Sequence, residues 1–573
     1  MNRCAVWAPN ASRVEVDSRG ARRAMTAVGW GWFELQDAAL EAGDDYSFVL
    51  DGGAARPDPR SLWQPHGVHS PSRAVDHDAF LWTDQGWRGR SLRDCVVYEL
   101  HVGTFSAAGT FDGAVEHLDH LVDLGVGAVE LLPVTAFPGT RGWGYDGVDL
   151  FAVHAAYGGP EGLKRFVDAC HGAGLAVVID VVYNHLGPDG NYLGEFGPYF
   201  TDRHRTPWGD AVNYDGAGSD EVRHFAVDNA LMWLRDYHCD GLRLDAVHAI
   251  VDTSAIHLLE EIAGAVHHLS AAVDRELWVI AESDLNDPRV VNDASHGGYS
   301  CDAQWSDDFH HALHATLTGE TSGYYEDFGR VEDVARSLRN VFVNPGGYSP
   351  FRQRRHGRPV ADLPGTRFLG YLQNHDQVGN RAQGARSAAL MSTGRLQIAA
   401  ALVLLGPFVP MLFAGEEWAA STPFQYFTDH QDVELGRLVS EGRRREFASF
   451  GWDPADVPDP QDPATFERSK LRWDEMVRHP HDTVLGWHRE LIALRAATPA
   501  IRSGDCSDVT VEFDEGARWL VMRRAGIVVA CNWGVGPAEL PVEPGTALLR
   551  NTELVTTGAG LLLQPDGVVV GLA

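Results

Sequence analysis

Gly241-Leu-Arg-Leu-Asp-Ala-Val-His248 is the stretch around which this chain is organised, because it places Asp245 at the end of a short apolar strand. In a parallel β/α barrel the C-terminal ends of the strands converge on one face, so polar side chains at several such ends meet there. Carboxylates gathered in this way can cleave glycosidic bonds. Three further stretches have the same form: Asp180-Val-Val-Tyr-Asn-His185, Val279-Ile-Ala-Glu282 and Phe368-Leu-Gly-Tyr-Leu-Gln-Asn-His-Asp376.

Length and charge restrict the possible partners. With 573 residues, 44% of them hydrophobic, the chain is too long for one ordinary domain, even though a barrel alone takes about 250 residues. Lys and Arg number 47 against 79 Asp and Glu, which gives a formal charge of -32. Such a charge repels phosphate backbones and anionic lipids, so we expect neither a nucleic acid nor a membrane as partner. A neutral ligand is expected instead.

The cysteines and the apolar segments indicate the compartment. Seven scattered cysteines without a Cys-x-x-Cys pair predict reduced thiols and no zinc site. The first residues lack a basic region followed by an apolar core, so no signal peptide is predicted and a cytoplasmic location is expected. The long apolar run 398–415 is interrupted by Gly406-Pro407 and by Pro410. It therefore predicts a helix end and a buried strand, not a membrane span.

Three domains are predicted along the chain. Residues 1–90 show short strands between Gly, Asp and Pro turns, which predicts an N-terminal β-sandwich with Trp7, Trp30 and Trp32 in its core. Residues 91–500 alternate apolar strands with helices, which predicts an α/β fold, a parallel (β/α)8 TIM barrel. Residues 501–573 return to short strands and predict a C-terminal β-sandwich. Whether either sandwich binds glucan stays open.

One connection inside the barrel is unusually long. Residues 184–219 are rich in Gly, Pro, Asp and Tyr and show no periodicity. Connections of this length in a compact domain are usually lids or binding loops. We therefore predict a binding loop here.

Four motifs together resemble the α-amylase family of glycoside hydrolases. They occur in the family's order and at workable spacings. The resemblance covers the whole barrel and implies a TIM barrel with a retaining mechanism. The motifs are Asp180-Val-Val-Tyr-Asn-His185, Gly241-Leu-Arg-Leu-Asp-Ala246, Ala281-Glu282 and Asn374-His-Asp-Gln377.

The resemblance assigns a role to each of three carboxylates. Asp245 would be the nucleophile and Glu282 the general acid and base, with their carboxyl groups about 5 to 5.5 Å apart, as retention requires. Asp376 would bind hydroxyl groups of the distorted sugar and stabilise the transition state. Arg243 would lower the pKa of Asp245 through its nearby positive charge.

Three further residues match substrate-binding positions of the family. His185 and His375 would hydrogen-bond the sugar at the cleavage point, and Tyr145 would form an aromatic platform beneath it. The alternative for each is ordinary packing. Asn184 stands where many amylases have a calcium ligand, but partner ligands are not identifiable, so neither a metal nor another cofactor is predicted.

Longer strings resemble a branch of the family that acts on trehalose-capped maltooligosaccharides. The resemblance implies hydrolysis of the α-1,4 bond next to the terminal trehalose. Phe351 and Arg352 would then recognise the departing trehalose. The strings include Trp143-Gly-Tyr-Asp146, Ser349-Pro-Phe-Arg-Gln-Arg-Arg-His-Gly357, Phe424-Gln-Tyr-Phe-Thr-Asp-His430 and Glu441-Gly-Arg-Arg-Arg-Glu-Phe-Ala448.

Two alternatives remain at this point. A glycogen branching enzyme shares the sandwich and the barrel but transfers the glycosyl unit to a sugar hydroxyl. A glucan-binding protein without catalytic activity would use the same fold, although the presence of all three carboxylates argues against it. The oligomeric state and the preferred chain length do not follow from the sequence.

Overall fold

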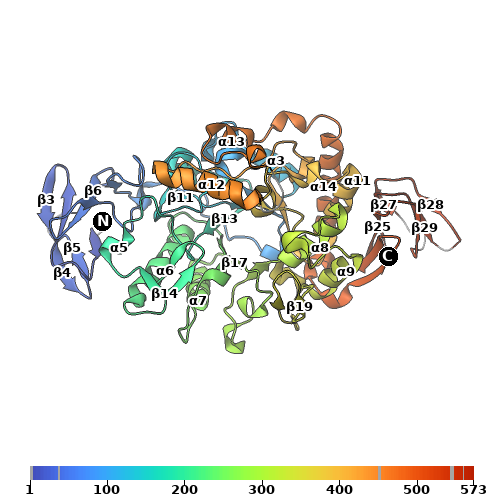
Figure 1. Ribbon diagram of the computed structural model, residues 1–573, viewed down its shortest axis with the longest axis horizontal. Helices are drawn as coiled ribbons and strands as arrows, with labels where there is room; N and C mark the ends of the chain where they lie inside the picture. The colour runs from blue at the N-terminus through green and yellow to red at the C-terminus, as the bar shows by residue number, and fades with distance from the viewer. Residues whose placement is uncertain (1–3, 37–38, 449–452, 543–546, 559, 573) are drawn as a thin grey trace.

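A computed structural model describes residues 4–36, 39–448, 453–542, 547–558 and 560–572. The barrel lies in the middle of an elongated molecule, with the N-terminal strands at one end and the C-terminal strands at the other (Figure 1). This is the predicted arrangement of a barrel flanked by two β-rich regions.

Eight parallel strands close the barrel, as predicted. Strand β9 pairs with β10 on one side and with β22 on the other, which completes the ring. The sixth strand is short but present. In order around the ring they are β9 (Val97–Leu100), β10 (Ala128–Leu131), β13 (Ala176–Val181), β16 (Gly241–Leu244), β17 (Trp278–Ala281), β18 (Ala303–Trp305), β21 (Phe368–Gly370) and β22 (Val409–Phe413).

The barrel interior changes from apolar to charged along its axis. Alternate residues of a strand point to the same side, so Val97 and Glu99 of β9 share the inner face. Beside Glu99 stands Glu130 of β10, and Asp180 of β13 stands beside Arg243 of β16. Barrel cores are ordinarily filled with branched apolar side chains. A charged layer at the C-terminal end therefore indicates a built site.

Helices cover the outside of the barrel. Helix α7 begins at Leu258, after a turn in which Asp252 accepts hydrogen bonds from the backbone N–H groups of Ser254 and Leu258. The major helices are α4 (Gly159–Gly172), α6 (Ser219–Arg235), α7 (Leu258–Val273), α8 (Asp307–Thr318), α9 (Val331–Asn340), α11 (Thr393–Leu405) and α14 (His481–Ala497).

Residues 111–124 have apolar side chains at helical spacing, but they form two helices and not one. These are α2 (Phe111–Val115) and α3 (Leu118–Leu124), with His117 between them stacked on Trp473 at 3.8 Å between ring centroids. Tertiary packing of this aromatic pair interrupts a helix that the apolar spacing alone favoured. The remaining short helices are α1 (Val102–Phe105), α5 (Leu193–Phe196), α10 (His375–Gly379), α12 (Val433–Ala448) and α13 (Pro463–Arg468).

The long connection after β13 is not without regular structure. It holds a hairpin of β14 (Phe200–Thr206) and β15 (Gly209–Val212), which pair antiparallel. At the hairpin turn Trp208 is 51% exposed. Polar residues dominate these two strands, so a simple apolar alternation could not reveal them.

The N-terminal region consists of two small antiparallel sheets. Trp7 is buried and its ring meets Tyr199 edge-on, so it belongs to the core as predicted. Trp30 does not, since it is 93% exposed at the turn between β4 and β5. The sheets contain β1 (Ala5–Trp7), β5 (Trp32–Glu34) and β4 (Thr26–Gly29), and β3 (Ala21–Ala24), β2 (Val14–Ser18), β6 (Asp45–Leu50), β7 (Ala55–Arg56) and β8 (Ser72–Arg73).

The C-terminal region is likewise built from two antiparallel sheets. Its core includes Leu540, Leu563 and Val569, all buried. The larger sheet holds β23 (Thr510–Asp514), β24 (Trp519–Arg524), β25 (Ile527–Asn532), β30 (Gly567–Leu572) and β27 (Ala547–Arg550). The smaller holds β26 (Ala538–Leu540), β29 (Leu561–Leu563) and β28 (Val555–Thr556).

Two predictions about the whole chain can be compared with the structure. All seven cysteines are free thiols, and only Cys506 among them is not fully buried. Among the described helices, none is long and apolar enough to cross a membrane. The apolar run 398–415 divides between α11 and β22, as its Gly and Pro residues predicted.

Candidate active site

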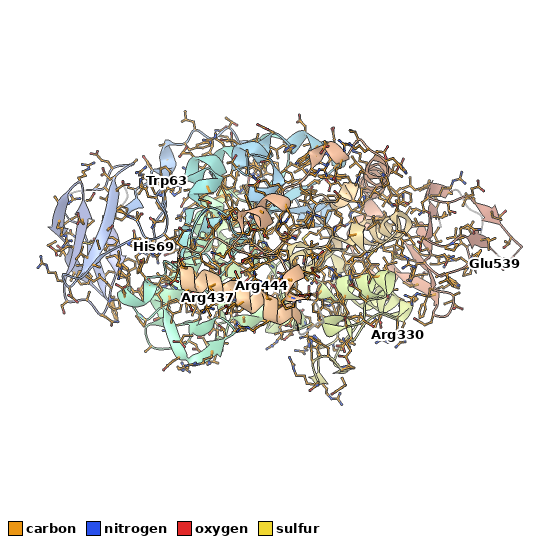
Figure 2. The ribbon with its side chains drawn as sticks, turned by 45° about the horizontal axis from the view of Figure 1, so that its top comes forward. Trp63, His69, Arg330, Arg437, Arg444 and Glu539 are labelled. Carbon is orange, nitrogen blue, oxygen red and sulfur yellow. The ribbon has the colours of Figure 1, made fainter. Side chains whose placement is uncertain are left out.

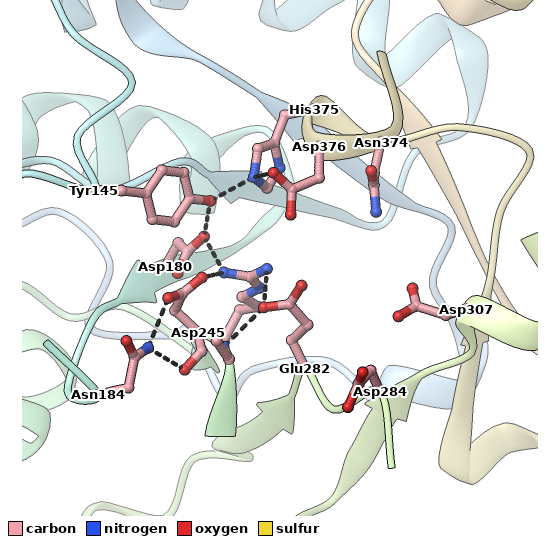
Figure 3. A network of polar contacts seen from close by, with 12 residues as sticks. Tyr145, Asp180, Asn184, Asp245, Glu282, Asp284, Asp307, Asn374, His375 and Asp376 are labelled. Atoms are coloured by element: carbon pink, nitrogen blue, oxygen red, sulfur yellow. Dashed lines mark hydrogen bonds and ion pairs between the residues drawn. The ribbon is translucent and has the colours of Figure 1, made fainter. Parts of the chain in front are cut away.

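The three predicted carboxylates meet at the C-terminal end of the barrel. Asp245 directly follows β16 and Glu282 directly follows β17, two neighbouring strands. Asp376 lies in the first turn of α10, beyond β21. Figure 3 shows all three facing one space. The parallel strands thus bring three residues that are far apart in the sequence into one cluster.

A single buried guanidinium joins the first two carboxylates. Arg243 Nη1 donates to Asp245 Oδ1 at 2.8 Å and to Asp180 Oδ2 at 2.7 Å. Its Nη2 lies 2.9 Å from Glu282 Oε2. The guanidinium itself is fully buried and stacks on the Trp305 ring at 4.3 Å. Removing a partner from a buried charge costs about 3–5 kcal/mol, so this arrangement is rigid.

The environments of Asp245 and Glu282 shift their pKa values in opposite directions. Burial alone would raise the pKa of Asp245, but the charges of Arg243 and His185 and the amide of Asn184 outweigh it, so this pKa is lowered. Burial raises the pKa of Glu282 well above its usual value, with Arg243 only partly opposing the shift. One carboxyl is thus kept ionised and the other protonated.

The backbone directly after Asp245 also contacts Glu282. Ala246 has a left-handed conformation, with φ 37°, and its N–H donates to Glu282 Oε2 at 2.8 Å. Such a conformation is strained for a residue with a Cβ and is common at functional sites. Because Oε2 faces this donor and the Arg243 guanidinium, the acidic proton of Glu282 belongs on Oε1.

The hydroxyl group of Tyr145 lies between Asp180 and His375. It donates to Asp180 Oδ2 at 2.6 Å and lies 2.8 Å from His375 Nε2. The two rings are stacked at 5.2 Å. The other ring nitrogen of His375 contacts Glu99 at 2.5 Å. Both nitrogens of His375 therefore have protein partners, and its predicted contact with the sugar stays a prediction.

His185 lies next to Tyr145 and Asn184. Its ring stacks on Trp208 at 4.2 Å, and its Nε2 is 3.1 Å from the carbonyl oxygen of Tyr145. The neighbouring Asn184 directs its amide nitrogen to Asp245 Oδ2 at 2.7 Å.

Among the described residues no group of three or more His, Cys, Asp or Glu side chains could hold a metal ion.

A cavity of about 580 Å³ contains this cluster. Helix α12 closes it opposite the carboxylates, and Figure 2 shows Arg437 and Arg444 of this helix in front of the barrel. Arg443 of the same helix donates to the carbonyl oxygen of Gly379 at 2.6 Å. The lining consists of Trp143, Tyr145, Asp146, His185, Trp208, Asp245, Ala246, His248, Glu282, Asp376, Asn380, Tyr426, Val439, Gly442, Arg443 and Glu446.

The two predicted specificity residues lie beside this lining. Phe351, in the turn between β19 (Tyr348–Ser349) and β20 (Arg354–Arg355), is 41% exposed. Arg352 pairs with Asp284 at 2.9 Å, and Asp284 lies 3.9 Å from His248 on the cavity wall. The loop is therefore joined to the rim on the Glu282 side. Their binding of sugar stays a prediction.

Several residues of the site were not expected from the sequence. Glu99 is an acidic residue inside an otherwise apolar strand, which is a readable signal of function. Asp307 follows β18, faces the cluster in Figure 3, and has a pKa raised by burial to about 7. Trp208 and Arg443 gave no periodic signal, because long-range packing alone brings them to the cavity.

Comparison with known proteins gives consistent matches. Residues 79–205 match the model of the alpha amylase catalytic domain, and residues 505–570 match a domain of unknown function, DUF3459. A malto-oligosyltrehalose trehalohydrolase of Arthrobacter ramosus is 52% identical over 99% of this chain and 98% of the relative. A solved structure, a putative alpha amylase from Salmonella typhimurium, is 39% identical with a TM-score of 0.92, covering 100% of this chain and 97% of its own.

A branching enzyme is a more distant match. The 1,4-alpha-glucan branching enzyme of Bacillus caldolyticus is 32% identical, but the alignment covers only 53% of this chain and 51% of that enzyme. The likeness to branching enzymes is therefore partial, whereas the likeness to the Arthrobacter protein is nearly complete.

Proposed function

We propose that this chain, which belongs to the malto-oligosyltrehalose trehalohydrolases of the α-amylase family, hydrolyses the α-1,4 bond adjacent to the terminal trehalose of maltooligosyltrehalose. The products are free trehalose and a maltooligosaccharide shortened by two glucose units. The proposal is carried by the meeting of Asp245 and Glu282 on one buried guanidinium, in a chain that matches a trehalohydrolase over nearly its whole length.

The first step forms a covalent intermediate. The ionised Asp245 attacks the anomeric carbon of the glucose at the cleavage point, while Glu282 gives its proton to the oxygen of the departing trehalose. A proton on Oε1 suits this role, since Oε2 is held by Ala246 and Arg243. Asp376 binds hydroxyl groups of the distorted ring and stabilises its positive charge.

The second step uses the same two residues. Glu282, now ionised, removes a proton from a water molecule that attacks the same carbon, and Asp245 departs as a carboxylate. Two inversions retain the α configuration. Tyr145 and His185 line the cavity on the nucleophile side and support the sugar ring there.

Recognition of trehalose requires groups on the side of Glu282. The Arg352–Asp284 ion pair presents hydrogen-bonding groups there, and Phe351 offers an exposed aromatic face. An aromatic face stacks on one glucose, and the polar pair binds hydroxyl groups of the other. These contacts favour trehalose over a reducing maltose, because the two disaccharides differ in shape and trehalose lacks a reducing end.

Product analysis on maltotriosyltrehalose tests the proposal. NMR of the fresh digest should show trehalose and maltotriose, with the new reducing end first in the α form. Formation of α-1,6 linkages from amylose, without trehalose release, would establish a branching enzyme instead. Absence of turnover on every α-glucan would establish a binding protein.

The free, mostly buried cysteines suit a reducing compartment, and we propose the cytoplasm.

A further inference from the structure

Glu99 is a buried carboxylate that the proposed mechanism does not use. It is the third residue of β9, faces the barrel interior and is 1% exposed. It accepts a hydrogen bond from the backbone N–H of His375 at 2.9 Å and lies 2.5 Å from His375 Nδ1. Both contacts lead to the residue that precedes Asp376. Glu99 thus joins the first barrel strand to the helix that carries the third catalytic carboxylate.

Hydrogen-bond accounting specifies the protonation of His375. The hydroxyl of Tyr145 has one proton, which it donates to Asp180 at 2.6 Å. Its oxygen must therefore accept from His375 Nε2, 2.8 Å away. On the other side Nδ1 faces the carboxylate of Glu99, which can only accept. Both ring nitrogens need a proton, so His375 is an imidazolium cation.

The same chain continues to the catalytic carboxylates. Asp180 also accepts from Arg243 Nη1 at 2.7 Å, and that nitrogen donates to Asp245 at 2.8 Å. Along this path the cations His375 and Arg243 donate and the carboxylates accept. Tyr145 accepts from His375 and donates to Asp180. Reversing the bond between His375 and Tyr145 would take the Tyr145 proton from Asp180 Oδ2, and that oxygen would keep the donor from Arg243 but lose the one from Tyr145.

Resting on the proposed function, we propose that Glu99 is a positioning residue for the glycosidase reaction. It keeps His375 doubly protonated, and His375 in turn directs the Tyr145 hydroxyl at Asp180 and so holds Arg243 between Asp245 and Glu282. Glu99 acts through these groups. Its carboxylate is occupied by His375 and it is 1% exposed, so it is not placed to touch the sugar.

The electrostatic surroundings of His375 agree with this assignment. Burial lowers the pKa of His375, but the charges of Glu99 and Asp376 outweigh burial, and the pKa is raised. The charged and titratable groups that face it come from several elements. They are Glu99 on β9, His101 after β9, Tyr145 on the connection between β10 and β13, Asp180 on β13, Arg243 on β16 and Asp376 on the same helix as His375.

The neighbouring strand supplies a matched control. Glu130 stands beside Glu99 across the β9–β10 pair and is also 1% exposed. Burial and the charge of Glu99 raise its pKa well above the usual value, so it is a neutral acid. Its Oε2 has no hydrogen-bond partner among the described residues. Replacing Glu130 with Gln therefore removes no charge from the same layer of the barrel.

The experiment compares Glu99→Gln, Glu99→Asp and Glu130→Gln in the full chain. For Glu99→Gln we expect kcat to fall about 100-fold with KM changed by less than about threefold, because a misdirected catalytic group affects the transition state rather than binding. Without the Glu99 charge the pKa of His375 falls. In the wild type the alkaline limb of the pH profile is set by Glu282. In Glu99→Gln the lowered pKa of His375 makes His375 lose its proton first, so the alkaline limb of the kcat profile moves down by at least about one pH unit.

The two other variants separate positioning from simple structural damage. Glu99→Asp keeps the charge and should restore the alkaline limb to its wild-type position, even if kcat stays lower. Glu130→Gln should keep both kcat and the limb near wild type. Circular dichroism and thermal unfolding check that each variant is folded.

Defined results would overturn the proposal. If Glu99→Gln lowers kcat but leaves the alkaline limb unmoved, or if Glu130→Gln moves it equally, Glu99 does not act through the charge of His375. The comparison needs only a turnover rate, so it can be made on plain maltooligosaccharides too. Failure of wild-type enzyme to release trehalose would contradict the proposed function separately.

Discussion

The two sides of the catalytic cavity are built differently. On the Asp245 side, Arg243, Asp180 and His375 are almost completely buried, and each is held by partners from barrel strands. On the Glu282 side, the Asp284 and Arg352 side chains are 33% and 22% exposed, and Phe351 is 41% exposed, all on loops. The charged groups to which we assign the chemistry lie on strands or directly after them. The groups available for choosing a leaving group lie on segments that can vary.

This difference has a physical cause. Neighbouring strands are held in register by backbone hydrogen bonds, so a side chain at a strand end is placed within a few tenths of an ångström. Loops carry fewer such restraints and tolerate changes in length and sequence. We therefore expect substitutions on the strand side to abolish turnover, whereas substitutions on the loop side should change the preference between substrates.

The largest effect should come from Asp245→Asn. Without a nucleophile the covalent route is closed, and kcat should fall at least about 10⁴-fold on every α-glucan. Arg243 keeps Asp180 as a partner, so thermal unfolding should show a folded protein. The matched control is Asp228→Asn, which replaces a half-exposed surface carboxylate. Retained turnover in Asp245→Asn would show that the nucleophile was assigned to the wrong carboxylate.

Glu282→Gln should have the next largest effect, and one that depends on the leaving group. Trehalose is a poor leaving group without a proton, so kcat on maltotriosyltrehalose should fall about 10³-fold. An α-maltosyl fluoride needs no proton for departure, and its first step should lose less than about tenfold. Equal losses on both substrates would contradict the assignment of Glu282 as the general acid.

The pH profile of the wild type reports the same pair. Turnover requires ionised Asp245 and protonated Glu282. Because the pKa of Asp245 is lowered, the acid limb should lie below the usual range of aspartate, and because that of Glu282 is raised, the alkaline limb should lie well above that of glutamate. A profile of kcat/KM from pH 3 to 10 would measure both limbs. An alkaline limb near pH 4.5 would contradict the shift of Glu282.

On the loop side, Phe351→Ala and Arg352→Ala should alter selectivity. Loss of one stacking or hydrogen-bonding contact costs about 1–3 kcal/mol, so kcat/KM for trehalose-capped chains should fall about 5- to 150-fold. The loss on plain maltooligosaccharides should be smaller. Arg354→Ala, an exposed arginine on the same loop, is the control. Equal losses on both substrates would indicate structural damage to the loop.

The smallest effect is expected from Trp208→Ala. The ring is 51% exposed and stacks on His185, so its removal should cost about 1 kcal/mol, or about fivefold in KM. Trp30→Ala removes an even more exposed tryptophan from the N-terminal sheets and serves as control. A KM that rises equally in both variants would place a second glucan-binding surface on the N-terminal sheets.

Local patterns of residues are enough to predict the barrel and the positions of the three carboxylates. Apolar strands, helices that end at Gly and carboxylates directly after strands are local signals, and parallel strands necessarily bring such ends to one face. Asp245 and Glu282 follow β16 and β17 as that pattern required. The pairing of Arg243 with Asp245 was also readable, because the two residues are two positions apart and so face the same side.

The groups that complete the site come from distant parts of the chain and are brought together by long-range packing. Glu99 meets His375 across 276 positions of sequence, and Trp208 reaches His185 from a polar hairpin without an apolar pattern. Helix α12 closes the cavity through packing of Arg443 against Gly379 and Tyr426. Contacts of this kind depend on where loops of different strands come to rest. That position is set by the summed packing of the whole barrel, not by any local pattern of residues.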